Sequence, residues 1–254
     1  MAGHSKWANI KHKKAKEDAR RGKLFSKLGR KIAVAAREGG DDPEMNSDLR
    51  LAIQKARDNN MPNDNIERAI KRGTGDLEGV SYESFVYEGY GPGGVALYLD
   101  LMTDNRNRTA SEIRHLLSKH GGNLGESGCV AWMFERKGQL IVDNDKTDMD
   151  EDELMLEALE AGAEDVVTDD DMITIFTKSS VFEEVRKNLE EKDIQFTSAD
   201  IAMIPDNKVE LDKKTAKKTL KLMDVLEDHD DVQEVYSNFD IPDEIMAEIG
   251  DEEE

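Results

Sequence analysis

Cysteine and long apolar runs are nearly absent from this chain of 254 residues. The single cysteine, Cys129, excludes a disulfide within the chain, and the five scattered histidines lack the cysteine partners of a structural zinc site. No stretch approaches the roughly 18 consecutive apolar residues of a membrane span, and the basic start lacks the apolar segment of a secretory signal. These absences predict a cytoplasmic protein without a membrane partner.

The motifs of the common enzyme classes are also missing. The sequence contains no Walker-type glycine loop, no G-x-S-x-G elbow and no His-x-Glu or Cys-x-x-Cys metal arrangement. Its one glycine-rich stretch, residues 87–94, lies between two predicted strands and not before a helix, so a hairpin turn explains it better than a phosphate loop. Cys129 lies among apolar residues and is interpreted as a small buried side chain. We therefore predict no enzyme activity, no cofactor and no metal site.

Hydrophobic residues are few, and charge is distributed unevenly. The hydrophobic fraction is 37% and the charged fraction 36%, against averages of about 45–50% and about 25%, so several small cores are expected. The net charge is −21, to which residues 1–75 contribute +8 and residues 76–254 contribute −29. This asymmetry predicts that the basic part meets a polyanion. The alternative is a molecule in which the basic segment folds onto an acidic face.

Hydrophobic periodicity predicts an α+β protein of three domains. The first is a bundle of three helices behind a basic arm; its first helix should end at Gly39 and Gly40, and its second should begin at Asp42 and Pro43. A ferredoxin-like βαββαβ unit is inserted in a middle α+β domain that opens with a β-hairpin and ends with a helix and a strand. The last residues are predicted to be a frayed acidic tail. The predicted bounds are 1–75 for the helical domain, 80–136 plus 206–240 for the middle domain, 137–205 for the inserted unit and 241–254 for the tail.

The basic arm is the strongest functional signal. Eight Lys and Arg residues fall within residues 6–23, opposed only by Glu17 and Asp18. Such a density of like charge favours an extended arm that becomes ordered when it binds phosphates. Trp7 offers a face on which a base could stack, or alternatively pins the arm to the helical core. The nucleic-acid-binding residues predicted in this region are Lys6, Trp7, Lys11, Lys13, Lys14, Lys16, Arg20, Arg21, Lys23, Lys27 and Arg30.

A second basic point lies in residues 105–108, which read Asn-Arg-Asn-Arg. These residues precede a helix predicted to span residues 109–119, with Thr109 or Ser111 as its cap. Guanidinium groups beside a helix start suit phosphates or base edges, so Arg106 and Arg108 are also predicted to bind nucleic acid. A loop held together by its own Asn and Arg hydrogen bonds is the competing interpretation.

Five stretches of the chain resemble the YebC family of probable transcriptional regulators, which also contains the mitochondrial translational activator of cytochrome oxidase subunit one. The resemblance covers most of the chain and weakens across residues 143–200 and in the acidic tail. The stretches that carry it are "MAGHSKWANIKHKKAK", "DNNMPNDNIERAIKRGTG", "YEGYGPGGVA", "TDNRNRTASEIRH" and "KHGGNLGESGCVAWMFERKG".

The resemblance implies a helical N-terminal domain and two α+β domains, with a non-enzymatic, cytoplasmic, nucleic-acid-binding role. Members are described both as DNA-binding transcriptional regulators and as ribosome-associated factors that relieve stalling. The helices show no concentration of base-reading side chains at one helix start, and a lysine-rich arm suits structured RNA as well as duplex DNA. DNA, ribosomal RNA or the ribosome, and a basic protein partner of an adaptor therefore all stay open as partners.

Overall fold

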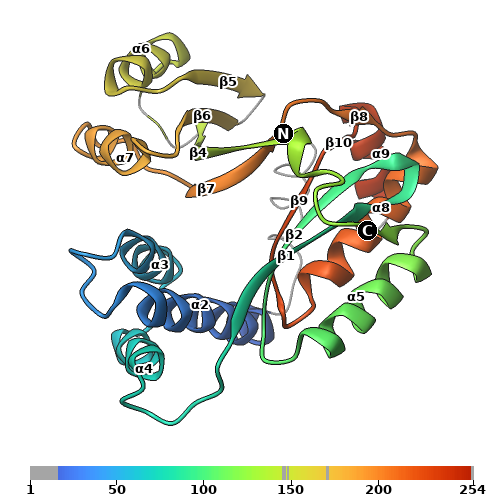
Figure 1. Cartoon of the computed structure of the whole chain (residues 1–254). Coiled ribbons are helices and arrows are strands. Elements are labelled where there is room, and N and C mark those ends of the chain that lie inside the picture. Colours follow the sequence, from blue (N-terminus) through green and yellow to red (C-terminus); the bar gives the residue numbers. More distant parts are fainter. Residues whose placement is uncertain (1–16, 145–146, 148, 170–171, 253–254) are drawn as a thin grey trace. The chain divides into compact units, whose positions relative to one another are not determined.

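The computed structural model describes residues 17–144, 147, 149–169 and 172–252, which divide into two compact units (Figure 1). Unit 1 contains the residues up to 131 and those from 208 onward, and unit 2 contains residues 132–207. The mixed α+β class predicted from the sequence is confirmed, because a helical N-terminal region is followed by two four-stranded sheets.

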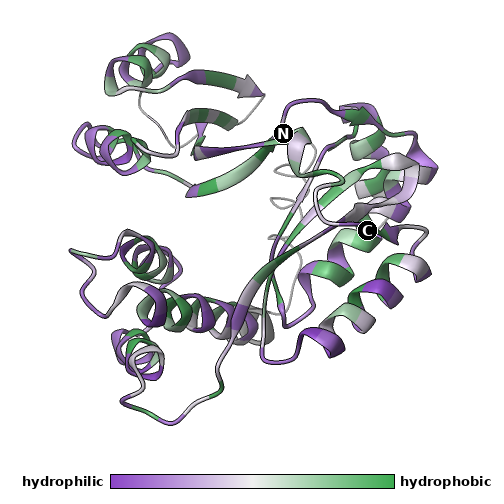
Figure 2. Cartoon of the chain, in the orientation of Figure 1, coloured by the Kyte–Doolittle hydropathy of each residue, from purple (hydrophilic) through white to green (hydrophobic). Residues whose placement is uncertain are grey.

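Three amphipathic helices form the N-terminal region of unit 1: α2 (Glu17–Gly39), α3 (Ser47–Asp58) and α4 (Asn63–Thr74). Hydrophobic and hydrophilic positions alternate around each helix in Figure 2, as expected when one stripe packs inward. Leu28 and Ile32 of α2 pack with Leu49 and Ile53 of α3 and Ile66 of α4. The predicted end of α2 is confirmed, since Gly40 follows with a φ of 88° that suits glycine.

The predicted start of the second helix was wrong. It was placed at Asp42 and Pro43, but α3 begins at Ser47 with Asn46 as its N-cap. The Asn46 side chain accepts a hydrogen bond from the Leu49 amide and donates to the carbonyls of Ala35 and Gly40. Asn46 thus caps α3 and ties it to the end of α2, a combination that Pro43 cannot provide.

The rest of unit 1 is a sheet with helices packed against it. Its strand order is β3-β1-β2-β9, and β1 and β2 form the predicted antiparallel hairpin, in which Phe85 lies opposite Leu101. Leu97, Leu99 and Leu101 of β2 pack with Ile113 and Leu117 of one helix and with Leu220 and Met223 of another. The elements are β1 (Glu83–Tyr90), η1 (Pro92–Gly94), β2 (Ala96–Thr103), α5 (Arg106–Lys119), β3 (Asn123–Leu124), β8 (Val209–Glu210), α8 (Lys213–Glu227), β9 (Val232–Ser237) and β10 (Phe239–Asp240), where β8 and β10 pair in parallel.

The end of the chain differs from the frayed tail predicted for it. Residues Asp243–Glu252 form helix α9, and Met246 and Ile249 are buried in the core of unit 1. Met246 and Ile249 are three positions apart and therefore share one helix face, while Asp243, Glu244 and Glu248 are exposed. The acidic composition of residues 241–254 led to the prediction of a frayed tail, although the segment contains an amphipathic helix.

Unit 2 has the βαββαβ order predicted for a ferredoxin-like fold, with the antiparallel sheet order β5-β6-β4-β7. The first strand, β4, begins at Phe134, before the predicted start of the inserted unit at residue 137. The short helix η2 (Ala131–Met133) precedes this strand, and its Trp132 is 69% exposed. The elements are β4 (Phe134–Asp143), α6 (Glu151–Ala161), β5 (Asp165–Asp169), β6 (Met172–Lys178), α7 (Phe182–Glu190) and β7 (Ser198–Pro205).

Among the described residues, none of the helices has the length and apolar character required to cross a bilayer.

Candidate functional site

The predicted nucleic-acid-binding residues fall into three groups. Lys6, Trp7, Lys11, Lys13, Lys14 and Lys16 lie outside the described residues. Arg20 and Arg21 belong to the first turns of α2, and Arg21 is exposed. The others, Lys23, Lys27, Arg30, Arg106 and Arg108, each contact other parts of unit 1.

Three cations of α2 contact the C-terminal end of α8 and the loop that follows it. Lys23 Nζ lies 3.2 Å from the carbonyl oxygen of Asp228, and Lys27 Nζ lies 2.6 Å from that of Glu227. Arg30 donates to the carbonyl of Asp230 at 2.7 Å. The last turn of α8 has no basic residue of its own, and the negative end of a helix dipole favours cations. The α2 cations therefore supply the positive charge that stabilises the C-terminal end of α8.

A further ion pair joins helix α3 to strand β9. Lys55 Nζ lies 2.7 Å from Oε1 of Glu234. Burial acts against ionisation of this carboxyl, but Lys55, Lys31 and Lys27 outweigh it and lower the pKa of Glu234 to about 2. Burial is also the largest influence on Lys27, whose pKa lies below its ordinary value despite Glu234 and Glu227 nearby. Electrostatic pairing thus joins the helical region to β9.

At the centre of this region is a buried carboxylate, Asp231, with four donors around it. Arg30 Nη1 lies 3.0 Å from Oδ1, and Arg108 Nη2 lies 2.9 Å from Oδ2. The hydroxyls of Thr103 and Thr109 lie 3.0 and 2.8 Å from Oδ2. We call these five residues the Asp231 cluster. Its members come from α2, β2, α5 and the loop between α8 and β9, so it ties these elements together.

The environment of the Asp231 cluster fixes its charge. Burial acts to raise the pKa of the Asp231 carboxyl, but hydrogen bonds from Arg108, Thr109 and Thr103 outweigh it, so this pKa lies below its ordinary value. The hydrogen bond to Asp231 raises the pKa of Arg108 in turn. The cluster therefore holds an ionised carboxylate between two guanidinium groups.

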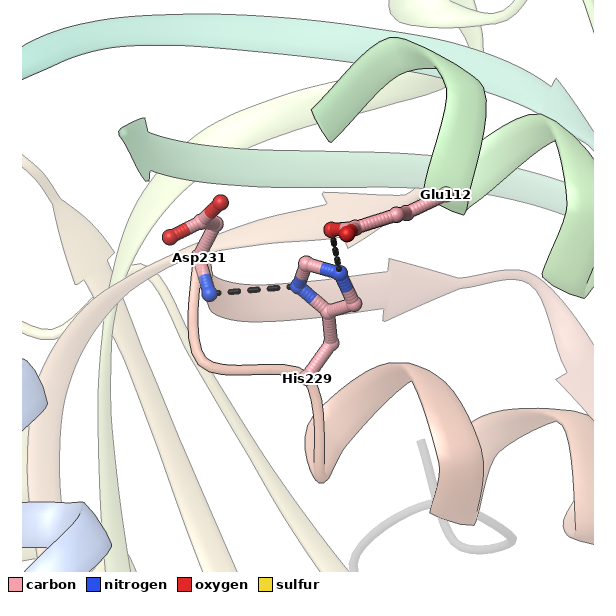
Figure 3. A group of neighbouring side chains, drawn as sticks. All are labelled: Glu112, His229 and Asp231. Carbon is pink, nitrogen blue, oxygen red and sulfur yellow. Dashed lines mark hydrogen bonds and ion pairs between the residues drawn. The ribbon is translucent and has the colours of Figure 1, made fainter. Parts of the chain in front are cut away.

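His229 lies next to the cluster, with its two ring nitrogens facing Glu112 and the backbone amide of Asp231 (Figure 3). The backbone amide of Asp231 donates to His229 Nδ1 at 3.1 Å, and Nε2 lies 3.0 Å from Oε2 of Glu112. Because Nδ1 accepts, the ring proton of neutral His229 resides on Nε2 and is donated to Glu112. The arrangement links α5 to the loop before β9.

Glu112, His229 and Asp231 bring potential ligand atoms within 4.8 Å of one another. The residues around them do not fit a metal ion, however. Both Asp231 oxygens are already occupied by Arg30 and Arg108, and a metal ion would have to displace a guanidinium and the Nε2 proton. The three residues are better described as part of a hydrogen-bonded ion-pair network.

A cavity of about 690 Å³ opens beside this network. Its charged lining combines the cations of Lys23, Arg30 and Arg108 with the carboxylates of five acidic residues: Asp104, Glu112, Asp228, Asp230 and Asp231. Carboxylates outnumber the Lys and Arg side chains, and Arg30 and Arg108 are engaged by Asp231. The cavity in this state is therefore unsuited to an anionic ligand.

The last three residues of the Asn-Arg-Asn-Arg stretch are the first residues of helix α5, and Asn105 is its N-cap. The predicted caps, Thr109 and Ser111, were wrong, because Asn105 caps the helix by accepting a hydrogen bond from the Arg108 amide. Arg106 stacks over the Phe85 ring at 4.6 Å from its centroid. Arg108 joins the Asp231 cluster. The segment thus starts a helix and is not the loop of the competing interpretation, while nucleic-acid binding by Arg106 and Arg108 stays a prediction.

A second buried carboxylate organises the loop after β3. Glu88 accepts hydrogen bonds from the amides of Gly128, Val130 and Ala131 at 2.6–2.8 Å. Burial raises the pKa of Glu88, but these three donors outweigh it, and the net shift is downward. Burial and the Glu88 charge both raise the pKa of the Cys129 thiol, which agrees with an unreactive cysteine.

Sequence reasoning missed Asp231, His229, Glu112, Glu234 and Glu88. The run "EDHDD" (residues 227–231) has the composition of a solvated turn. One signal was present: α8 begins with lysines and ends with acids, which is the reverse of what the helix dipole favours. An acidic helix C-terminus is stabilised only when other parts of the molecule bring cations to it.

The fold and the Asp231 cluster define a multi-domain α+β protein whose N-terminal helices are bound to the end of its middle sheet. Two family descriptions match its sequence: "TACO1/YebC protein N-terminal domain" over residues 5–76 and "TACO1/YebC second and third domain" over residues 82–239. The chain belongs to the TACO1/YebC family, which confirms the resemblance seen in its sequence.

Curated relatives match along nearly the whole chain. A "Probable transcriptional regulatory protein" of Halothermothrix orenii is 80% identical over 99% of this chain and 100% of its own length. One of Natranaerobius thermophilus with the same name is 61% identical over 97% and 99%. The crystal structure of a conserved hypothetical protein from Aquifex aeolicus is 52% identical, covers 93% of this chain and 97% of its own, and has a TM-score of 0.83.

Proposed function

We propose that this chain is a cytoplasmic, non-enzymatic DNA-binding transcriptional regulator of the YebC type, which binds phosphates through its basic N-terminal arm. The observation that carries the proposal is the concentration of eight Lys and Arg residues in residues 6–23 of a chain with net charge −21. Such a segment supplies backbone affinity that depends on counterion release. The names of the relatives support a regulatory role.

Four of the predicted binding residues already have partners within unit 1. Lys23, Lys27, Arg30 and Arg108 are paired with oxygens of residues 227–231. A phosphate would have to replace those oxygens before these four residues could bind it. In this proposal the arm up to Arg21 makes the first phosphate contacts, and the paired cations hold the helical region in place.

The test is DNA binding at several salt concentrations. A full-length variant with Lys11, Lys13 and Lys14 changed to Ala should bind a 20-base-pair duplex more weakly, with a salt slope reduced by about 0.9 for each phosphate that the arm no longer neutralises. A matched variant with Lys178, Lys187 and Lys192 of unit 2 changed to Ala removes the same charge and should bind like the parent. Unchanged affinity and slope in the arm variant would refute the arm as the binding surface.

Lysine contacts to phosphates do not distinguish duplex DNA from structured RNA. Binding of the arm to the ribosome must therefore be measured beside its binding to DNA. Genome-wide DNA crosslinking and ribosome co-sedimentation should be performed on the same cells. Discrete promoter sites would support the transcriptional role. Ribosome enrichment without discrete DNA sites would overturn it in favour of a translation factor.

One observation favours a second function, that of a protein-interaction adaptor. Helix α6 of unit 2 exposes Met155, Leu156 and Leu159, at 36, 63 and 48% of their surface. Exposed carboxylates of Glu151–Glu153 and Glu160 accompany them, and α6 has no basic residue. An apolar strip with an acidic rim suits a basic amphipathic protein segment.

The adaptor function is tested by comparing proteins that crosslink to the parent and to a Leu156→Asp, Leu159→Asp variant in cells. A partner that is absent from this variant but retained by the arm variant would establish a separate protein-binding role. Identical crosslinks in both proteins would leave α6 without this function.

A further inference from the structure

A second cationic surface lies on helix α8, within the part of the sequence whose total charge is strongly negative. Five lysines fall within the first nine positions of α8. Lys214, Lys217, Lys218 and Lys221 are exposed, and Lys213 is half-buried. The buried residues of α8, such as Ala216, Leu220 and Met223, occupy the opposite side and pack into the core. The lysines therefore form a continuous outer stripe.

The first two of these lysines, Lys213 and Lys214, are placed against the local preference of the helix. The first turn of α8 contains no acidic residue, and the N-terminal end of a helix dipole disfavours cations. Asp212 compensates in part, because it caps the helix by accepting a hydrogen bond from the Thr215 amide. Lys213 and Lys214 lie in this first turn and oppose helix stability. Departures from local preference mark candidate functional surfaces.

Charges on the neighbouring elements neutralise one edge of this stripe. Lys213 Nζ lies 2.6 Å from Oε2 of Glu248 in α9, and the Glu248 carboxylate also attracts Lys217. Asp212 lies near Lys214. The carboxylates of Glu248 and Asp212 thus neutralise part of the positive charge at the Lys213 edge of the stripe.

The opposite edge of the stripe meets further positive charge. Helix α5 packs against α8, and its end brings Lys119 and His120 toward Lys221. The pKa of His120 lies below its ordinary value, first because of burial and then because of the two lysines. We call Lys119, Lys214, Lys218 and Lys221 the α8 lysine face.

We propose that the α8 lysine face binds the sugar-phosphate backbone of nucleic acid as a second contact surface, separate from the N-terminal arm. The proposal rests on the proposed nucleic-acid-binding function and extends it to a part of the chain that is acidic in total. From Lys214 to Lys221 the helix rises roughly 10 Å, which spans about three phosphates of one strand. Lysines without a planar donor fork bind phosphates as point charges, so this contact is independent of base sequence.

The experiment measures binding of the full-length protein to two probes, a 20-base-pair duplex and a 20-nucleotide single-stranded RNA, across salt concentrations. A variant with Lys214, Lys218 and Lys221 changed to Gln should lower the salt slope for duplex by between about 1 and about 2.7, at about 0.9 per phosphate. The control changes the same three residues to Arg and should retain parental affinity and slope. A Gln variant that binds both probes like the parent would overturn the proposal.

Lysine acetylation footprinting of the unaltered protein provides a measurement that does not depend on a variant. Lys119, Lys214, Lys218 and Lys221 should be protected when the duplex is added, while Lys178 and Lys187 of unit 2 should not. Equal modification of the face with and without the probe would refute the contact.

Failure of this proposal and failure of the arm proposal give different results. A reduced slope in the Gln variant but not in the arm variant supports the α8 lysine face and refutes the arm. A reduced slope in the arm variant alone refutes the α8 lysine face. A parent protein that binds neither probe refutes both.

Discussion

Arg30 and Asp231 are 201 positions apart in the chain, and the guanidinium Nη1 of Arg30 lies 3.0 Å from the Oδ1 atom of Asp231. This contact joins helix α2 of the N-terminal region to the loop that leads into β9. Arg108 holds the other carboxylate oxygen, so a single acidic side chain links the helical region, α5 and the sheet.

Replacing Asp231 with Asn should destabilise the protein by about 2–4 kcal/mol, because two guanidinium groups lose their buried ionic partner. The free energy of unfolding in urea measures this effect. Asp230→Asn changes an exposed neighbour and should alter stability by less than about 0.5 kcal/mol. Equal stability of both variants would show that the cluster does not hold the elements together.

Replacing Lys55 with Met should raise the pKa of Glu234 from about 2 toward its ordinary value, since Lys55 is its closest cationic partner. A folded-state pKa below the unfolded value of 4.5 stabilises the protein above pH 4.5, and this contribution is lost as pH falls toward 2. The parent should therefore be more stable than the variant at pH 7, by a margin that shrinks below pH 4.5. NMR titration of Glu234 measures the pKa directly, and a margin constant down to pH 2.5 would contradict the pairing.

Replacing Glu88 with Gln should destabilise the loop of residues 125–131 by about 2 kcal/mol, because an amide cannot accept from three backbone N–H groups as the carboxylate does. The pKa of Cys129 should fall as the Glu88 charge is removed, and the thiol should react faster with iodoacetamide. Glu126→Gln is the comparison variant, since Glu126 is exposed in the same loop and is the smaller of the two charges that raise the pKa of Cys129. It should leave stability nearly unchanged and accelerate alkylation less than Glu88→Gln does. Unchanged alkylation in Glu88→Gln would refute the role of Glu88.

Replacing Ile249 with Ala should cost about 2–4 kcal/mol of unfolding free energy, because Ile249 is 2% exposed and its truncation leaves a cavity in the core of unit 1. Glu244→Ala, on the exposed side of the same helix, should be nearly neutral. Thermal denaturation of both variants compares them. Parental stability in Ile249→Ala would mean that the C-terminal segment is solvated after all.

The spacing of apolar residues predicted those helices and strands whose buried face can be recognised within their own sequence. The spacing of Leu28 and Ile32 identified the inward face of α2, and alternation in residues 83–90 and 96–103 identified the hairpin. The βαββαβ order of unit 2 was legible because each element carries its own apolar pattern and is bounded by turns.

Features that depend on distant partners could not be predicted in the same way. The cap at Asn46 depends on carbonyls of Ala35 and Gly40 that only the folded turn presents. Asp231 resembles any acid in a charged turn until folding brings Arg30 and Arg108 to it. A sequence shows the positive charge of Arg30 and Arg108 but not that both side chains contact the same internal carboxylate.

The boundaries of unit 2 have a consequence for the order in which the chain folds. At its base, Phe134 of β4 pairs with Pro205 of β7, and the Asp206 amide donates to the Met133 carbonyl, so the unit closes on itself within residues 132–207. The sheet of unit 1, by contrast, needs β9, which follows that entire segment. During synthesis from the N-terminus, unit 2 has all its strands before the sheet of unit 1 receives its last one. Until then the β2 edge lacks its partner, so nascent chains should be most prone to misassembly in the interval between synthesis of β2 and synthesis of β9.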